Sequence, residues 1–318
     1  MNRNNILSII IPAYNAEKYI SNTINYILNS KLQAEVIIIN DGSKDNTLVI
    51  CKELQKQYPN LEVITQQNKG VSAARNLGIK YSHGKWLFFC DADDWIDVRG
   101  ITLLLEKAEE LGEEYLMMGA MNFIKPNGTF LHAVPDDKML NPRDYLNSNI
   151  FQGSSCNYLF SSKLVRDNNI FFPENVVNTE DSNFNIKAVC CCKSIYSLNI
   201  PIYNYNHMNI MAAHRSNVSL QWRMGPLLSA YDVLNYCKER NITVDVVSVQ
   251  IDRLVEYYYR SYIYGHHTFD DLKYIRNILE RISEFCPIIA KSLKFKAIKL
   301  QPYIGLSLIR IYNYFRIR

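Results

Sequence analysis

The chain has 318 residues and a mass of 37.0 kDa, and 48% of its residues are apolar and 21% are charged. This composition excludes a disordered or collagen-like chain and allows one large domain or two smaller ones. The net charge is +4, but the 34 residues after Glu284 hold seven Lys or Arg and no acid, which leaves −3 for residues 1–284. The body of the chain is therefore not expected to bind nucleic acid.

Nothing in the sequence indicates secretion or a membrane span. The N-terminal run MNRNNILSIIIPAYN lacks a small-residue cleavage pattern, so it predicts a first core strand rather than a signal peptide. There is no stretch of about 18 uninterrupted apolar residues. The eight cysteines show no C-x-x-C pair of zinc spacing. We expect a cytoplasmic protein with reduced thiols.

Strand and helix patterns alternate through the first hundred residues. Short β-branched or aromatic runs predict strands over 7–11, 35–39, 61–65 and 86–90. Helical patterns lie between them, from Ile20 to Leu28 and over about 45–57 and 71–81. This alternation is typical of an α/β fold with a mostly parallel sheet flanked by helices.

The pattern changes further along the chain. From about 100 to 215 it loosens into mixed strands and loops, with a strand near 195–204 and a helix near 181–191. From about 222 onward, helical periodicity predicts helices near 224–240, 245–263, 269–283 and 287–300. We therefore divide the chain into a catalytic α/β domain, 1–215, and a C-terminal helical region, 216–318.

The run WLFFCDADDW, Trp86 to Trp95, is a buried strand that ends in three carboxylates. Asp91, Asp93 and Asp94 cannot all be buried and charged without a cation nearby. Alternation along an extended chain places Asp91 and Asp93 on one side, where their oxygens suit Mg²⁺ or Mn²⁺. A solvated acidic loop is the alternative for such a D-x-D motif.

Two other polar segments follow predicted strands, where ligands of parallel sheets bind. In INDGSKDNT, Asp41 can accept a hydrogen bond from a ligand and Gly42 can take a positive φ. In NKGVSAARNLGI, small residues open a helix and Arg75 projects one turn in, where its fork suits phosphate or carboxylates. Taken singly, these are also an ordinary turn and a helix start with a solvated Arg.

Taken together and in this order, SIIIPAYN, INDGSKDNT, NKGVSAARNLGI and FFCDADDW resemble the N-terminal half of glycosyltransferase family 2, inverting enzymes of the Rossmann-like GT-A fold. The resemblance covers residues 6–98 strongly and 150–206 more weakly. It implies that Asp41 holds the base of a nucleotide-sugar donor, that Arg75 and Asp91 hold the donor, and that Asp93 ligates Mn²⁺ or Mg²⁺. The other donor-site residues that it implies are Pro12, Tyr14, Asn15, Asn68, Gly70 and Ala92. The family commonly has two acids where this chain has Asn40 and Asp41, so Asp41 is left as the base-reading carboxylate.

The segment NTEDSNF is similar to the family's E-D-x-x-F element. The resemblance makes Glu180 and Asp181 catalytic and Asp181 the base that deprotonates the acceptor hydroxyl. Acidic residues also favour the positive end of a helix dipole, so a plain helix start is the alternative. The implied reaction is one in-line displacement with inversion at the anomeric carbon.

Two further features bear on the site. His207 and Arg215 follow the last predicted strand and are candidates for contact with the diphosphate, although a solvated loop is the alternative. Processive relatives carry a Gln-x-x-Arg-Trp element, whereas here Gln221, Trp222 and Arg223 have another order and spacing. We therefore expect a non-processive enzyme.

The basic, aromatic-rich C-terminal segment is compatible with a peripheral contact on the inner membrane face. Packing on the fold or a homo-oligomer contact is the alternative. A membrane position would suit a glycan or lipid-linked saccharide acceptor of the capsule, O-antigen or lipooligosaccharide type. The donor is expected to be a UDP-sugar, carrying a hexose or N-acetylhexosamine.

The sequence leaves two alternatives to a glycosyltransferase. A sugar nucleotidyltransferase uses a Gly-rich basic loop for its triphosphate, and SIIIPAYN has neither Gly nor a basic residue. A non-catalytic nucleotide-sugar-binding protein would not need Asp93, Glu180 and Asp181. Both are less consistent with the sequence than a glycosyltransferase.

Overall fold

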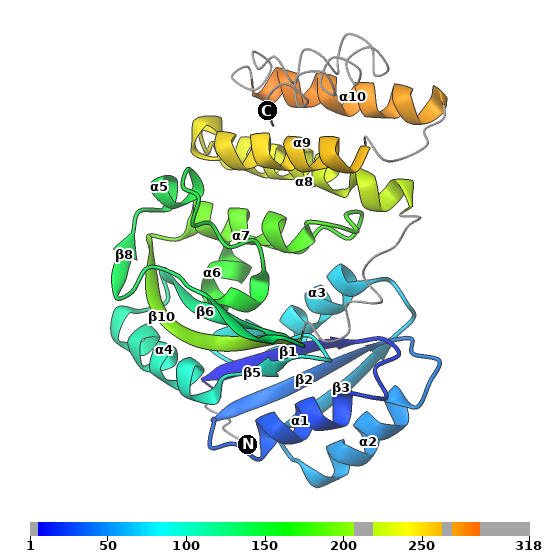
Figure 1. Ribbon diagram of the computed structural model, residues 1–318, viewed down its shortest axis with the longest axis vertical. Coiled ribbons are helices and arrows are strands. Elements are labelled where there is room, and N and C mark those ends of the chain that lie inside the picture. Colours follow the sequence, from blue (N-terminus) through cyan, green and yellow to red (C-terminus); the bar gives the residue numbers. More distant parts are fainter. Residues whose placement is uncertain (1–5, 207–218, 263–268, 287–318) are drawn as a thin grey trace.

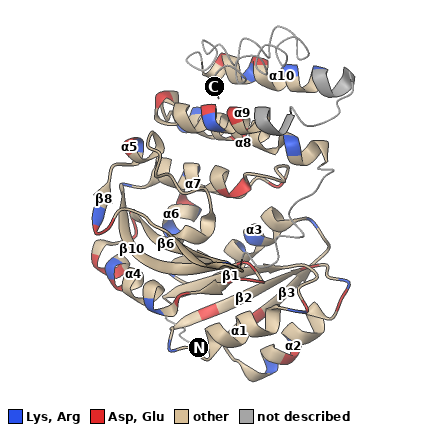
Figure 2. Cartoon of the chain, viewed as in Figure 1, with Lys and Arg blue, Asp and Glu red and all other residues tan. Residues whose placement is uncertain are grey.

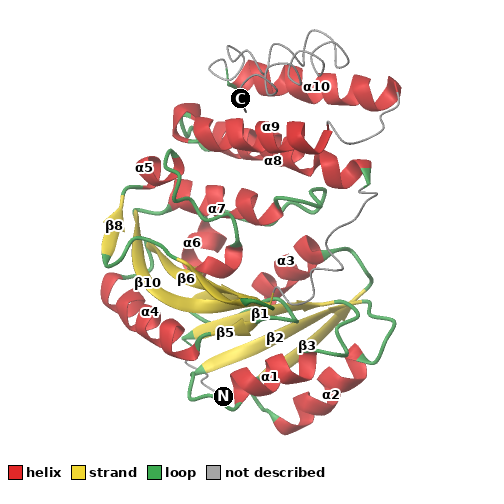
Figure 3. Cartoon of the chain, in the orientation of Figure 1, coloured by secondary structure: helices red, strands yellow, loops and turns green. Residues whose placement is uncertain are grey.

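The computed structural model describes residues 6–206, 219–262 and 269–286 (Figure 1). Its centre is a sheet of ten strands, eight of which follow the order β3-β2-β1-β4-β9-β6-β10-β5. Helices cover both faces of the sheet, with α1, α2 and α4 on one side and α3, α6 and α7 on the other (Figure 3). Helices α8 to α10 stack beyond α7.

The first half of the sheet is parallel, as predicted. Its order β3-β2-β1-β4 places β1 between β2 and β4, and each crossover from one strand to the next contains a helix. The predicted strands and helices are confirmed to within two residues. The elements are β1 Leu7–Ala13, α1 Ile20–Leu28, β2 Ala34–Asp41, α2 Thr47–Gln57, β3 Leu61–Gln66, α3 Val71–Tyr81 and β4 Trp86–Phe89.

Strand β2 shows why these apolar runs form strands. All eight of its residues are buried, as expected for a strand covered on both faces. Val36 and Ile38 join the main core, whereas Ile37 and Ile39 pack with Ala74 of α3 in a separate cluster. The alternation of side chains thus divides the strand between two helix layers.

The second half of the sheet is mixed. Strand β9 is antiparallel to both β4 and β6, and β6 runs parallel to β10. Strands β5, β7 and β8 add antiparallel edges. The elements here are β5 Trp95–Ile96, α4 Val98–Leu111, β6 Tyr115–Lys125, β7 Gly128–His132, β8 Lys138–Leu140, α5 Pro142–Leu146, β9 Tyr158–Ser161, α6 Ser162–Asp167, α7 Glu180–Cys191 and β10 Ser194–Asn206, with a short 3-10 helix at Ser155–Asn157.

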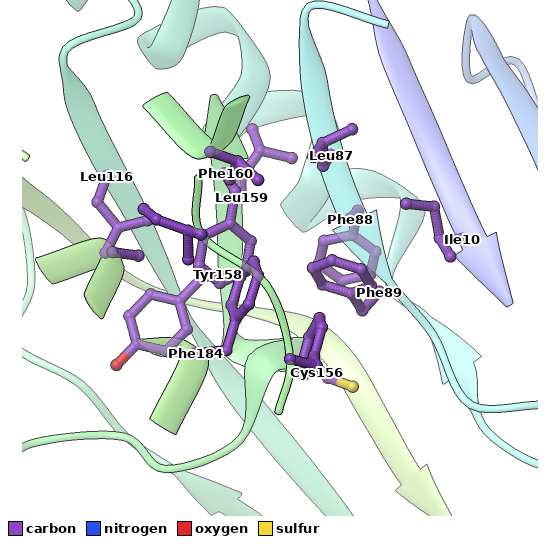
Figure 4. Close-up of a cluster of buried hydrophobic side chains, with 14 of the residues drawn as sticks. Ile10, Leu87, Phe88, Phe89, Leu116, Cys156, Tyr158, Leu159, Phe160 and Phe184 are labelled. Carbon is purple, nitrogen blue, oxygen red and sulfur yellow. The ribbon is translucent and has the colours of Figure 1, made fainter. Parts of the chain in front are cut away.

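An aromatic cluster fixes α7 against the sheet (Figure 4). The ring of Phe184 stacks on Phe172 with centroids 4.1 Å apart, and it meets Phe89 and Phe160 edge-on at 5.6 and 5.1 Å. Such pairs add about 0.5–1.5 kcal/mol each beyond the area that they bury. The Phe of the E-D-x-x-F element therefore anchors the helix whose first turn carries Glu180 and Asp181.

The C-terminal helices pack on α7. Lys187 pairs with Asp232 of α8, and Asn183 donates to the same carboxylate at 2.9 Å. Helix α8 begins a few residues before the predicted start because the Ser219 hydroxyl caps it through the Trp222 N–H. The helices are α8 Leu220–Glu239, α9 Ser248–Tyr262 and α10 Phe269–Phe285, with a 3-10 helix at Val244–Val246 between α8 and α9.

Several C-terminal expectations fall outside the described residues. They are the helix at 287–300, the basic segment, and the first half of the boundary at 215–222. The division into two domains stays a prediction. Within the described ranges, none of the helices has the length and apolar character needed to cross a membrane.

A buried carboxylate ties together the amino ends of the parallel strands. Glu35 of β2 is 3% exposed and accepts from the Ser8 hydroxyl at 2.5 Å and from the N–H groups of His83 and Gly84 at 2.6 and 3.1 Å. Burial raises the pKa of Glu35, but these hydrogen bonds outweigh burial and lower the pKa below its ordinary value. This edge of the sheet is opposite the one where ligands of such folds bind.

We predict that Glu35→Gln lowers the free energy of unfolding by about 1–3 kcal/mol near neutral pH, because hydrogen bonds to a charged acceptor are lost. A carboxylate with a lowered pKa stabilises the fold above its unfolded pKa and stops doing so as pH falls through the folded pKa. The difference between wild type and variant in urea denaturation should therefore shrink from about pH 5.5 to about pH 3. A difference that stays constant across this range would contradict the assignment.

Candidate functional site

A cavity of about 420 Å³ opens at the carboxyl ends of β1, β2 and β4. This is the edge at which the sequence predicts a ligand, and the polar turns after these three strands meet there. Its walls come from these turns, from α3 and from the start of α7. The lining residues are Pro12, Ala13, Tyr14, Asn15, Ala16, Tyr19, Asp41, Val71, Ala74, Arg75, Asp91, Ala92, Asp93 and Glu180.

Arg75 joins the two acidic walls of this cavity. Its side chain is 3% exposed, and it donates from Nη2 to Asp91 Oδ1 at 2.9 Å and from Nη1 to Asp181 Oδ1 at 2.7 Å. A longer contact of 3.4 Å reaches Glu180. The guanidinium also lies 5.2 Å from the centre of the Phe172 ring. Although burial alone would lower the pKa of Arg75, Asp181 and Asp91 raise it, so the group remains a cation.

The two acids at the start of α7 are in different positions. Glu180 lines the cavity, whereas Asp181 lies beside it, where its second oxygen accepts from the Ser155 N–H at 3.3 Å. Burial and the neighbouring Asp181 raise the pKa of Glu180 to about 7, against the effect of Arg75. Burial also raises the pKa of Asp181, again opposed by Arg75. Glu180 can therefore exchange a proton near neutral pH.

Asp41 is held at the rim by backbone donors. Its carboxylate accepts from the N–H groups of Lys69 and Gly70 and from the Gln66 amide, each at 2.8 Å. Gly42 has the predicted positive φ of +69°, and a Cβ there would lie 2.7 Å from the Asn68 nitrogen. Asn68 and Gly70 do not line the cavity; they fix the loop against which Asp41 rests.

The turn after β1 is tied to the turn after β2. Asn15, at a positive φ of 51°, donates from its N–H to the Ser43 hydroxyl at 3.1 Å and accepts from the Lys44 N–H at 2.8 Å. Tyr14 projects from the same turn and is 46% exposed. These bonds hold the predicted base-binding turns in one arrangement.

Asp91 and Asp93 lie on the same side of the chain, as the alternation of side chains along an extended segment predicts. Asp91 and Asp93 face the cavity, whereas Asp94 is buried behind it and accepts from the Tyr203 hydroxyl at 2.6 Å and the Asn206 N–H at 2.7 Å. The Tyr203 oxygen also accepts from the Asp91 N–H at 3.0 Å. Burial, followed by the nearby Asp91, raises the pKa of Asp94 to about 7.

Asp91 and Asp93 are the residues able to hold a divalent ion. Their hard oxygens suit Mg²⁺ or Mn²⁺, and within the described ranges the Asp93 carboxylate forms no hydrogen bond or ion pair with another residue. Burial and Asp91 raise the pKa of Asp93, as expected for carboxylates facing each other without a cation between them. Across the same ranges, no three His, Cys, Asp or Glu side chains gather into a metal-binding group. The pair fits an open site in which a ligand completes the coordination.

The structure places the predicted site residues unequally. It brings together nine of them at the cavity, and it puts Asp181, Asn68 and Gly70 in supporting positions. His207 and Arg215 lie outside the described residues. Five residues of the site were not predicted: Tyr19, Ser155, Phe172 and Tyr203 belong to no recognisable motif, and Val71 lies in the NKGVSAARNLGI segment without a chemical group that indicates a role.

Comparison with known proteins identifies the family. The model of Glycosyl transferase family 2 matches residues 8–168, which is half of the chain. The chain belongs to this family.

Two relatives show how far the likeness extends. The uncharacterized glycosyltransferase EpsJ of Bacillus subtilis is 28% identical over 208 residues, which are 63% of this chain and 60% of EpsJ. The poly(ribitol-phosphate) beta-N-acetylglucosaminyltransferase TarS of Staphylococcus aureus is 29% identical over 206 residues, 62% of this chain and 35% of TarS. The matched part of the chain thus spans less than two thirds of either relative.

A solved structure confirms the fold. The crystal structure of S. aureus TarS 1–349 in complex with UDP superposes with a TM-score of 0.65 and 22% identity, covering 88% of this chain and 81% of that one. The TarS structure in complex with UDP-GlcNAc gives 0.64 and 20%. The predicted GT-A fold, with helices at the C-terminus, is correct.

We predict that Tyr203→Phe lowers the free energy of unfolding by about 1–3 kcal/mol, because the buried Asp94 carboxyl and the Asp91 N–H each lose a partner. Urea denaturation measures this change. Tyr26→Phe is the matched control, since Tyr26 is 49% exposed and its hydroxyl can bond to water. The control should change stability by less than about 0.5 kcal/mol. Equal losses in the two variants would show that the Tyr203 hydroxyl does not support the site.

Proposed function

We propose that the chain is a non-processive, inverting glycosyltransferase that moves a sugar from a UDP-sugar to a hydroxyl of a glycan or lipid-linked saccharide. The observation that carries this proposal is the position of Arg75. This buried cation holds Asp91, which lines the cavity, and Asp181, which lies beside the cavity at the start of α7. A donor in this cavity would have its diphosphate near Asp91 and Asp93 and its sugar near the two acids of α7.

The proposed donor is supported by the relatives and by the cavity. TarS has been crystallised with UDP and with UDP-GlcNAc. The cavity volume of about 420 Å³ is within the usual range for small-molecule sites. Asp41 can accept a further hydrogen bond from the base or the ribose, because a carboxylate has about four acceptor positions and three are in use.

The charge of the cavity supports a divalent ion. Four of its described lining residues are acidic, and Arg75, the cation among them, is already paired with carboxylates. A diphosphate would add negative charge to this cavity. Bound between Asp91, Asp93 and the diphosphate, Mn²⁺ or Mg²⁺ would supply the positive charge that stabilises the leaving nucleoside diphosphate.

In the proposed reaction, Asp181 takes the proton of the acceptor hydroxyl as its oxygen attacks the anomeric carbon. The bond from that carbon to the diphosphate breaks in the same step, so the configuration inverts. Ser155 and Arg75 hold the Asp181 carboxylate by both oxygens and fix its direction. Glu180, whose carboxyl faces the cavity, is placed to contact the sugar.

A cell-surface polymer is the proposed acceptor class. TarS and a further relative, 31% identical over 198 residues, are named as poly(ribitol-phosphate) glycosyltransferases. A third relative, 43% identical over 93 residues, is named as a minor teichoic acid biosynthesis protein. Work at the cytoplasmic membrane face, with contact through the C-terminal segment, is part of the proposal.

We predict that Asp181→Asn lowers turnover by about 10²–10⁴-fold, because an amide cannot take the proton. Candidate donors are first ranked by thermal shift with Mn²⁺, and release of UDP from the best one then measures turnover. Donor binding should be retained, since Asn keeps an oxygen for Arg75. Unchanged turnover would refute the assignment of the base.

Glu180→Gln is the matched control for this variant, because it makes the same chemical change one residue earlier. Its turnover should fall by less than about tenfold, which corresponds to a rise of about 1.4 kcal/mol in the activation free energy. If Glu180→Gln instead shows the larger loss, the base is Glu180. Circular dichroism of both variants separates a catalytic loss from unfolding.

A second prediction concerns the metal. Asp93→Asn should weaken Mn²⁺ binding in the presence of UDP by about tenfold or more, measured by calorimetry or by the Mn²⁺ paramagnetic signal. EDTA should abolish transfer by the wild type, and added Mn²⁺ should restore it. Asp167→Asn, an acid of α6 outside the cavity, is the control and should bind Mn²⁺ as the wild type does. Equal Mn²⁺ affinity in both variants would remove Asp93 from the metal site.

A further inference from the structure

The cavity of about 420 Å³ described above, which is the proposed donor site, is called the donor cavity below. A second cavity, of about 730 Å³, lies against the opposite face of α3. Val71, Ala74 and Arg75 of this helix line the donor cavity, whereas Asn76 and Lys80 line the second one. Helix α6 and the loop before α7 complete its walls. No proposed step of the reaction uses this cavity.

The second cavity is positively charged. Lys69, Lys80 and Arg166 line it, and none of the three forms an ion pair with a described carboxylate. Glu174 is the acid among its described lining residues. This excess of positive charge contrasts with the net charge of −3 that residues 1–284 carry as a whole. Figure 2 shows basic residues on α3 and α6. Such a concave basic surface concentrates anions.

The charges are spread along the length of α3. Lys69 comes just before the helix and Lys80 is one residue from its end, with Arg166 bonded to the carbonyls of Ile79 and Ser82 at that same end. Eleven helical residues span about 16 Å. A ligand that meets both ends must therefore be elongated and must carry more than one negative charge.

An exposed aromatic ring lines the same cavity. Phe171 is 44% exposed, although its neighbours Ile170 and Phe172 are buried. Asn76 holds this loop in place, accepting from the Phe172 N–H and donating to the Phe172 carbonyl, both at 2.9 Å. A preorganised, exposed ring in a basic cavity matches a saccharide or sugar-alcohol chain, whose C–H groups form apolar surfaces.

We propose that this second cavity binds an elongated anionic saccharide or sugar-alcohol chain, namely the part of a phosphate-bearing acceptor polymer that lies away from the reacting hydroxyl. The proposal rests on the proposed function and specifies its acceptor as anionic. The two cavities are coupled through Phe172, which lines the second and lies 5.2 Å from the Arg75 guanidinium that lines the first. The loop that starts at Phe171 leads directly to Glu180 and Asp181.

The test uses the full chain and the double variant Lys80→Glu/Phe171→Ala. Binding of poly(ribitol phosphate) at low salt is compared with binding of neutral dextran, in the absence of donor. The wild type should bind the phosphodiester polymer and not dextran, and added salt should weaken the binding. The double variant should bind about tenfold or more weakly, while its thermal shift with UDP and Mn²⁺ stays unchanged.

Lys163→Glu/Phe130→Ala is the matched control, with an exposed lysine of α6 and an exposed phenylalanine of β7 that lie outside the second cavity. Equal polymer binding by both double variants, or equal binding of dextran and poly(ribitol phosphate), would overturn the proposal. Phosphatidylglycerol vesicles provide a further comparison. If the Lys80→Glu/Phe171→Ala variant loses binding to these vesicles but keeps its binding to the polymer, the proposal is overturned and the cavity is a membrane contact. Failure of the proposed function has a different signature, namely no transfer from any UDP-sugar whatever the polymer affinity.

Discussion

The arrangement of the site depends on the burial of one cation. The Arg75 guanidinium is almost inaccessible to water, so its charge must be compensated by carboxylates brought to it. These come from positions 16 and 106 residues away, at the end of β4 and the start of α7. The ion pairs therefore fix three segments relative to one another, and removal of any member would leave a buried charge without compensation. The same requirement sets the distance across the donor cavity.

The two edges of the parallel sheet use buried carboxylates in opposite ways. At the amino edge, Glu35 is surrounded by donors that favour its charged form, and it serves stability. At the carboxyl edge, burial, followed by the charge of neighbouring acids, raises the pKa values of Asp93, Asp94 and Glu180. Such a concentration of acids is unfavourable in the free protein. The proposed divalent ion would offset this repulsion, and the proposal therefore links the binding of metal to that of the donor.

Helix α3 organises the chemistry on both of its faces. Small residues at its start let the donor cavity reach the helix, and Arg75 projects into that cavity. The opposite face presents Asn76 and Lys80 to the basic second cavity. Phe172 lies between the two, against Arg75 and against Phe184 of α7. A polymer held along α3 would thus contact the structure that positions Glu180 and Asp181, the acids of the proposed reaction.

The sequence by itself determined the first four strands, their helices and the polar turns that follow them, because alternation and helical spacing are local properties of the chain. It also placed Asp91 and Asp93 on one side. Tertiary structure alone decided that β9 inserts antiparallel between β4 and β6, that Tyr203 reaches Asp94 across 109 residues, and that Asp181 lies beside the cavity while Glu180 lines it. These contacts depend on strand order and on the packing of α7 through Phe184. Local periodicity carries no information about either, because many strand orders bury the same apolar residues.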